Sequence, residues 1–139
     1  MGLFDRFKSE PPKLSPRMAL AAGLLYMLAS DGQIEEEEIG QLQSVVGGDR
    51  SLLETAVKYW RAVKFDQFLH DVPAVLNDAQ RLCLLVNACD SLLSDGVAAP
   101  QEQAMFGQLL QAMAVSEDQF RPYFEAIAVK NNRSVFGSS

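Results

Sequence analysis

An all-helical fold is predicted by three features of the sequence. Apolar residues recur at three- and four-residue steps along most of the chain, the spacing that places them on one face of an α-helix. Residue pairs that start helices, and glycines that end them, punctuate these stretches. No stretch shows the alternation of apolar and polar residues that is typical of a half-buried strand. We predict a single compact all-α domain of about seven to eight helices.

Length, composition and charge limit the possible functions. The chain has 139 residues, of which 48% are hydrophobic and 22% charged, and these fractions exclude a disordered chain. No apolar run approaches the roughly 18 residues that a membrane-spanning helix requires. The net charge of −6 repels phosphate backbones, so we expect no nucleic-acid partner. We expect a soluble, cytoplasmic protein.

We divide the chain into an N-terminal tail and linker over residues 1–14, a helical domain over residues 15–130 and a polar C-terminal tail over residues 131–139. The first residues lack the long apolar stretch of a signal peptide. Residues 3–8 combine apolar and charged side chains as a short amphipathic turn. We expect this turn to dock on the domain rather than on a membrane or a partner, because so short a helix is marginal alone.

The first half of the domain predicts three helices. A Ser-Pro pair begins the first helix, over residues 15–30. Apolar side chains cover most of its circumference, so this helix should lie deep in the core. The second covers residues 35–46 and ends at a Gly-Gly pair that permits a left-handed cap. The third begins between residues 49 and 51, where Ser51 and Glu54 have the spacing of a capping box.

The middle of the chain predicts short helical turns on either side of Pro73, over residues 65–69 and 72–76. His70 lies in this stretch without a second His or a neighbouring Cys. A surface or capping role therefore fits His70 better than zinc binding or catalysis.

The second half again predicts three helices, over residues 78–94, over residues 100–113 and from a capping box at Ser116 onwards. The first of them is largely apolar, and we interpret its two thiols, Cys83 and Cys89, as reduced core residues.

A polar stripe nevertheless runs along that helix. Buried polar atoms need partners, so the stripe must face water, another polar element or an ion. Its residues are Asn87, Asp90, Ser91 and Ser94.

The two halves repeat one another at an offset of 64 residues. Leu-Ala-Ser-Asp-Gly at residues 28–32, with Glu38, recurs as Leu-Leu-Ser-Asp-Gly at residues 92–96, with Glu102. Self-similarity at a fixed period marks a duplicated structural unit. We predict an internal pseudo-twofold helix-turn-helix repeat with one acidic Asp-Gly turn in each half.

These turns define two acidic corners: Asp31 with Glu38, and Asp95 with Glu102. Carboxylates held together repel one another, and a divalent cation relieves that repulsion. Asp90, five residues before Asp95, adds a carboxylate to the second corner. Asp-Gly is also ordinary turn chemistry, acidic residues suit helix N-termini without any ion, and the spacing does not fit an EF-hand. An ion site and simple helix capping both remain open.

An enzyme is not expected. The chain contains no nucleophile with a plausible His partner and no glycine-rich phosphate loop, because the Gly-Gly pair at residues 47–48 lacks a following Lys and Ser or Thr.

The doubled motif resembles the TerB family of tellurite-resistance proteins and TerB-like domains. The resemblance rests on Asp-Gly-Gln-Ile at residues 31–34, Asp-Gly-Val-Ala at residues 95–98, the Glu seven residues after each Asp, and the Leu-Leu-Gln-Ala-Met-Ala-Val run at residues 109–115. It covers about residues 14–129. It implies an all-helical, non-enzymatic module of bacterial stress responses such as tellurite resistance, associated with metal ions in complexes near the inner membrane.

The family's acidic positions carry over to Asp31, Glu38, Asp95 and Glu102, with Asp90 as an addition. The resemblance thus implies a divalent ion, and the all-oxygen ligands favour calcium over zinc. The implied partners are other stress- or tellurite-resistance proteins, with peripheral inner-membrane association through a partner.

Two departures from the family pattern weaken the implied ion site. Ser30 and Ser94 replace the usual Ala before Asp, and the spacer at residues 97–100 lacks the family's extra acidic residues. The alternative function is an interaction scaffold without metal, in which the acidic turns only cap helices.

Overall fold

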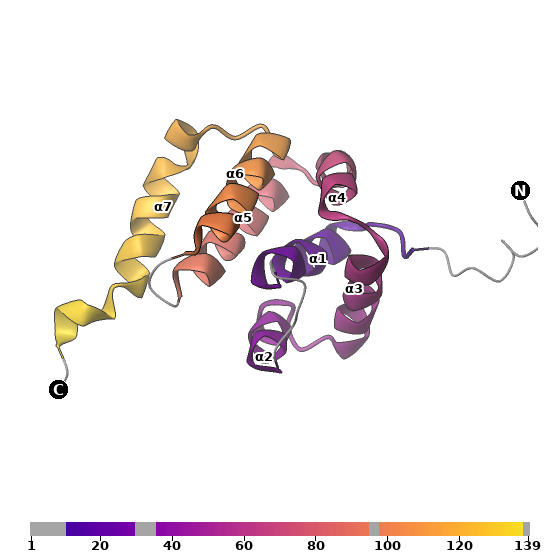
Figure 1. Cartoon of the computed structure of the whole chain (residues 1–139), viewed down its shortest axis with the longest axis horizontal. Helices are drawn as coiled ribbons and strands as arrows, with labels where there is room; N and C mark the ends of the chain where they lie inside the picture. The colour runs from indigo at the N-terminus through magenta and orange to yellow at the C-terminus, as the bar shows by residue number, and fades with distance from the viewer. Residues whose placement is uncertain (1–10, 30–35, 95–97, 138–139) are drawn as a thin grey trace, which may run out of the picture.

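The computed structural model of the chain describes residues 11–29, 36–94 and 98–137 (Figure 1). Within these residues the chain forms seven α-helices and two short 3-10 turns, with no strand, which confirms the predicted all-α class. The helices are α1 (Pro16–Leu28), α2 (Glu36–Val45), α3 (Arg50–Ala62), α4 (Phe65–Asp71), α5 (Asp78–Leu93), α6 (Pro100–Ala112) and α7 (Glu117–Asn131), and the 3-10 turns are η2 (Val72–Val75) and η3 (Arg133–Phe136).

Several helices begin where the sequence predicts. The Ser15 hydroxyl accepts a hydrogen bond from the Met18 backbone N–H at the start of α1. At the start of α7, Ser116 and Gln119 form the predicted reciprocal capping box. These local hydrogen bonds satisfy donors that the first turn of a helix leaves unpaired, so sequence alone located them.

The cap of α3 differs from its prediction. Asp49 is the N-cap, and its carboxylate accepts a hydrogen bond from the Leu52 backbone N–H at 3.0 Å. Ser51 already lies inside α3, so the predicted capping box of Ser51 and Glu54 is wrong. The physical reason is that Asp49 offers an acceptor two residues earlier, which lets the helix begin sooner.

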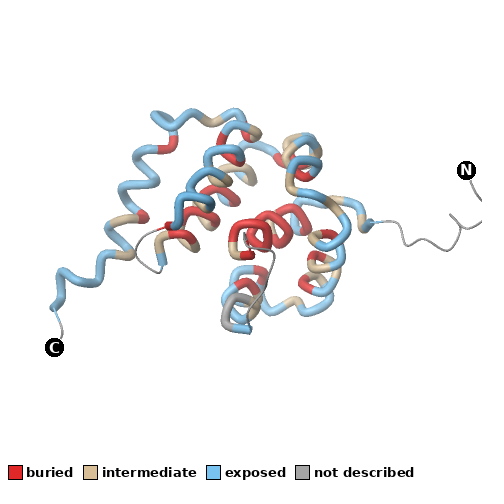
Figure 2. Tube along the Cα trace, in the orientation of Figure 1, coloured by how far each residue is buried: buried red, intermediate tan, exposed pale blue. Residues whose placement is uncertain are grey.

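The α1 helix forms the centre of the core, as predicted. Every residue from 21 to 27 is buried, and α1 packs against α2, α3, α5 and α6 (Figures 1 and 2). Gly23 allows the approach of α5, because a Cβ at this position would lie only 2.8 Å from the Leu84 Cδ1 atom. The small side chain is therefore a packing requirement rather than a flexible joint.

The packing of the two halves is similar in outline. The α1 helix contacts α2 and α3, α5 contacts α6 and α7, and α1 and α5 pack against each other. The predicted duplication would place the helices in this way, and the duplication itself stays a prediction.

The two thiols lie in different environments. Cys89 is buried, as predicted, whereas Cys83 is exposed, so its assignment to the core is wrong. Six residues along a helix correspond to a rotation of about 240°, so one packed face cannot hold both side chains.

Some predictions fall outside the described residues, namely the amphipathic turn over residues 3–8 and the Asp-Gly steps at residues 31–32 and 95–96. The η3 turn forms most of the described part of the predicted C-terminal tail. No helix in the described part of the chain is long and apolar enough to cross a membrane.

Candidate functional site

The second acidic corner lies between the end of α5 and the start of α6. Glu102 stands in the first turn of α6, where its Oε1 atom accepts a hydrogen bond from the Ala99 backbone N–H at 3.0 Å. Gln103 donates from Nε2 to the Ala98 carbonyl at 2.8 Å and closes the same turn. Glu102 therefore caps α6, which is the role that the helix-capping alternative for this corner predicts.

Asp90 is held by the end of α7. Its two carboxylate oxygens accept hydrogen bonds from Lys130 Nζ at 2.9 and 2.8 Å, and Oδ1 also accepts one from Asn131 Nδ2 at 2.8 Å. Partial burial raises the pKa of the Asp90 carboxyl, but the hydrogen bonds from Lys130 and Asn131 and the Lys130 charge lower it by more, so the pKa lies below its ordinary value. Asp90 is a firmly ionised carboxylate with a protein cation as its partner.

The polar stripe of α5 thus meets another polar element, one of the three possibilities that the sequence left open. Asn87 and Ser94 instead bond backbone carbonyls of their own helix, those of Cys83 and Ser91. A cation at Asp90 would have to displace the Lys130 ammonium group.

The other predicted ligands are Asp31, Glu38 and Asp95. Asp31, Asp95 and the side chain of Glu38 lie outside the described residues. In residues 11–29, 36–94 and 98–137, no three His, Cys, Asp or Glu side chains come close enough together to hold a metal ion. The structure brings neither Asp90 nor Glu102 to a shared ion site within those residues.

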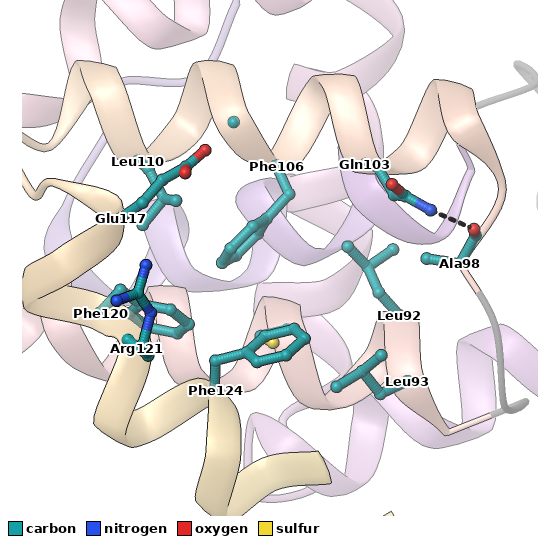
Figure 3. A pocket seen from close by; sticks show the side chains of 12 residues that line it. Leu92, Leu93, Ala98, Gln103, Phe106, Leu110, Glu117, Phe120, Arg121 and Phe124 are labelled. Atoms are coloured by element: carbon teal, nitrogen blue, oxygen red, sulfur yellow. Dashed lines mark hydrogen bonds between the residues drawn. The ribbon is translucent and has the colours of Figure 1, made fainter.

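An apolar cleft, which the sequence did not predict, lies between α5, α6 and α7 (Figure 3). Its volume is about 470 Å³. Figure 3 shows Phe106 pointing into the space between α6 and α7, with Glu117 and Arg121 toward one end and Gln103 toward the other. Its apolar lining includes Leu92, Leu93, Phe106, Leu110, Phe120 and Phe124.

The α7 helix contained a signal for this cleft. Its sequence places aromatic side chains at Phe120, Tyr123 and Phe124, the i, i+3, i+4 spacing that gathers them on one face of the helix. Phe120 is buried, while Tyr123 and Phe124 are 42% and 45% exposed. The fold therefore covers only part of this aromatic face, and a partly exposed apolar face marks a candidate binding surface.

His70 has the surface role that the sequence predicts. Its ring is exposed, and Nδ1 lies 3.0 Å from an oxygen of Asp71. Among the hydrogen bonds of the described residues, the partner of this ring is the Asp71 carboxylate.

Comparison with known protein families shows to which family the chain belongs. Residues 17–123, well over half of its length, match the family model of tellurite resistance protein TerB. The chain belongs to the TerB family. The TerB match extends from α1 into α7 and includes both acidic corners. Comparison of this TerB protein with curated proteins and with solved structures gives no significant match.

The boundary of the TerB match separates Asp90 from its partners. Asp90 lies inside the matched residues, whereas Lys130 and Asn131 lie beyond residue 123. The part of α7 that engages the polar stripe therefore follows the TerB match in this chain.

Proposed function

We propose that this TerB domain is a non-enzymatic module of tellurite-resistance-related stress responses that binds a divalent cation and docks partner proteins. The ion ligands are Asp31 and Glu38 at one corner and Asp95 and Glu102 at the other. The domain works in the cytoplasm and reaches the inner membrane through a partner. The observation that carries the proposal is the TerB match, which includes both corners.

The chemistry of the ligands favours calcium. All four residues supply carboxylate oxygens, which calcium prefers, and the set contains none of the Cys or His ligands that are typical of zinc. The hydrogen bond from Ala99 uses one oxygen of Glu102. A carboxylate has about four acceptor positions, so capping does not exhaust its ability to bind an ion.

Asp90 is a conditional ligand in this proposal. It joins the second corner only when Lys130 releases it, because both of its oxygens contact the Lys130 ammonium. Replacing Lys130 by Met removes that charge and keeps most of the aliphatic stem. Tighter calcium binding by Lys130→Met would assign Asp90 to the site, and unchanged binding would remove it.

A second candidate function is an interaction scaffold without metal. The contact between Glu102 and Ala99 favours it, because this contact shows the acidic residue of the second corner acting as a helix cap. Capping and ion binding make different demands on Glu102. Gln at this position still accepts the capping hydrogen bond but has lost the charge that attracts a cation.

The test uses metal-stripped protein and calorimetric titration with calcium, manganese and magnesium. The variant Asp95→Asn with Glu102→Gln removes two charges at the second corner, and Glu54→Gln with Asp66→Asn removes two exposed charges on α3 and α4 as a matched control. We expect binding heat and a raised melting temperature for the wild type and the control, and weaker binding for the corner variant. Absence of both effects at millimolar ion in the wild type would leave the scaffold as the function.

Partner docking is tested with the same proteins. Affinity capture from tellurite-exposed cells compares the wild type, the corner variant and the matched control, each with and without calcium. Loss of stress-resistance proteins with the corner variant alone would place docking at the corners. Equal recovery with all three proteins would place docking on another surface.

A further inference from the structure

We propose that the cleft between α5, α6 and α7 is a self-association site that receives the η3 turn of a second copy of this chain. The residues that enter the cleft are Val135 and Phe136. This inference does not depend on the proposed ion, because neither the cleft nor η3 includes a residue of the acidic corners.

The receiving surface is an open, mainly apolar cleft of about 470 Å³. Phe124 on its α7 wall is 45% exposed, although most of the apolar side chains around it are partly or fully buried. Figure 3 shows Phe124, Leu92 and Leu93 converging from α7 and α5. Apolar walls exposed to water gain free energy when a complementary side chain covers them.

The entering segment is the most exposed apolar part of the described C-terminal region. Val135 is 71% and Phe136 82% exposed. Gly137 follows with a φ of 72°, a left-handed conformation that glycine adopts at little cost and that ends the turn just after Phe136. The turn therefore presents an aromatic side chain to solvent at its tip.

The η3 turn lies outside the cleft of its own molecule, because no residue of η3 is part of the cleft lining. Lys130 and Asn131, at the end of α7, both bond Asp90 on α5 and fix the direction in which the chain leaves the helix. Figure 1 shows η3 beyond the end of α7, on the side away from α6. A second copy can bring Phe136 into the cleft while these bonds stay intact.

The charges around the two surfaces favour this pairing. The η3 turn carries one basic residue, Arg133, and no acidic one, in a chain whose net charge is −6. Arg133 is exposed and precedes Phe136 by one 3-10 turn, and Glu117 stands at the edge of the cleft. The cleft residue Arg121 is already paired with Asp118 at 3.1 Å, which reduces its repulsion of Arg133.

Two arrangements satisfy this contact. Reciprocal exchange, in which each copy inserts η3 into the other, gives a closed twofold dimer. Insertion in one direction only gives an open chain of copies. The exchanged form buries both turns at once, so we assign the dimer.

The test measures the oligomeric state of the full chain by sedimentation velocity across a concentration series. Phe136→Ser removes the entering side chain, and Gly107→Phe obstructs the cleft from a position where an added Cβ meets nothing within 4 Å. Val129→Ser is the matched control, because Val129 is 77% exposed and lies about half a turn around α7 from Phe120. Circular dichroism confirms that each variant is folded.

We expect a concentration-dependent dimer for the wild type and for Val129→Ser, and a dissociation constant at least about tenfold higher for each of the other variants. A mixture of Phe136→Ser and Gly107→Phe keeps one intact turn and one intact cleft, so it should form a heterodimer that neither variant forms alone. A wild type that stays monomeric throughout the series, or a dimer that Phe136→Ser leaves unchanged, would overturn the inference.

Discussion

The Lys130 ammonium group lies 2.9 and 2.8 Å from the two carboxylate oxygens of Asp90, a residue forty positions earlier in the chain. With the hydrogen bond from Asn131, this ion pair fastens the end of α7 to α5. The most polar face of a core helix thus finds its partner in a second helix. Sequence spacing made Asp90 a candidate metal ligand, but in the fold its carboxylate is already paired with the Lys130 ammonium group.

Asp90→Asn should lower the free energy of unfolding by about 1 kcal/mol, because the neutral amide loses the charge-assisted bonds to Lys130 while one-third exposure of Asp90 limits their value. Chemical denaturation measures this difference. Glu125→Gln, on the exposed surface of α7, is the control and should change stability little. Equal losses in the two variants would mean that the ion pair is not a stabilising link.

The same residue predicts a dependence of stability on pH. The pKa of Asp90 is lower in the folded protein than its ordinary value, so its contribution is present above that value and is lost as the pH falls through the folded pKa. Below about pH 4, the wild type should therefore lose more stability than Asp90→Asn. Parallel acid titrations of the two proteins would contradict this assignment.

Gly23→Ala should destabilise the fold, although alanine is the better helix former. Its Cβ would lie 2.8 Å from Leu84 Cδ1 and 3.3 Å from Phe68 Cζ, and both of these side chains are fully buried. We expect a loss of about 1 kcal/mol, the overpacking penalty less the gain in helix propensity. Gly40→Ala, with no atom within 4 Å of the new Cβ, should gain stability. Thermal unfolding of both variants decides the sign.

Tyr26→Phe should lower the free energy of unfolding by about 1 kcal/mol. The Tyr26 hydroxyl donates a hydrogen bond to the Val63 carbonyl at 2.5 Å and links α1 to the end of α3. Burial, with a smaller contribution from Tyr59, raises the pKa of Tyr26 in the folded state. The stability due to this shift is present below about pH 10 and is lost as the pH rises toward the folded pKa, because the unfolded chain ionises first. Tyr26→Phe should be less sensitive to pH in that range.

The two cysteines should react with a thiol reagent at different rates. Cys83 is exposed, whereas burial and the neighbouring Asp90 charge raise the pKa of Cys89 to about 11. Because the thiolate is the reactive form, the reagent should modify only Cys83 rapidly in the native protein and both cysteines in the denatured protein. Cys83→Ser should abolish the rapid phase. Persistence of that phase would mean that Cys89 is accessible.

Short-range features of this fold were predictable from sequence. The Ser15 and Ser116 caps depend on side chains that bond backbone atoms three residues away, so the spacing of the residues contains the necessary information. The periodic apolar residues of α1 predicted its buried position for a similar reason. At the candidate site, the sequence located Glu102 in the first turn of its helix but left open whether it caps or binds an ion.

The sequence by itself determined the helical class, most helix limits and the resemblance to the TerB family, because periodicity, caps and short motifs depend on residues close together in the chain. Tertiary structure alone decided that Lys130 holds Asp90, that Cys83 faces solvent and that three helices line an open apolar cleft. These features depend on which helix faces meet, and periodicity shows that a face is apolar without showing what covers it.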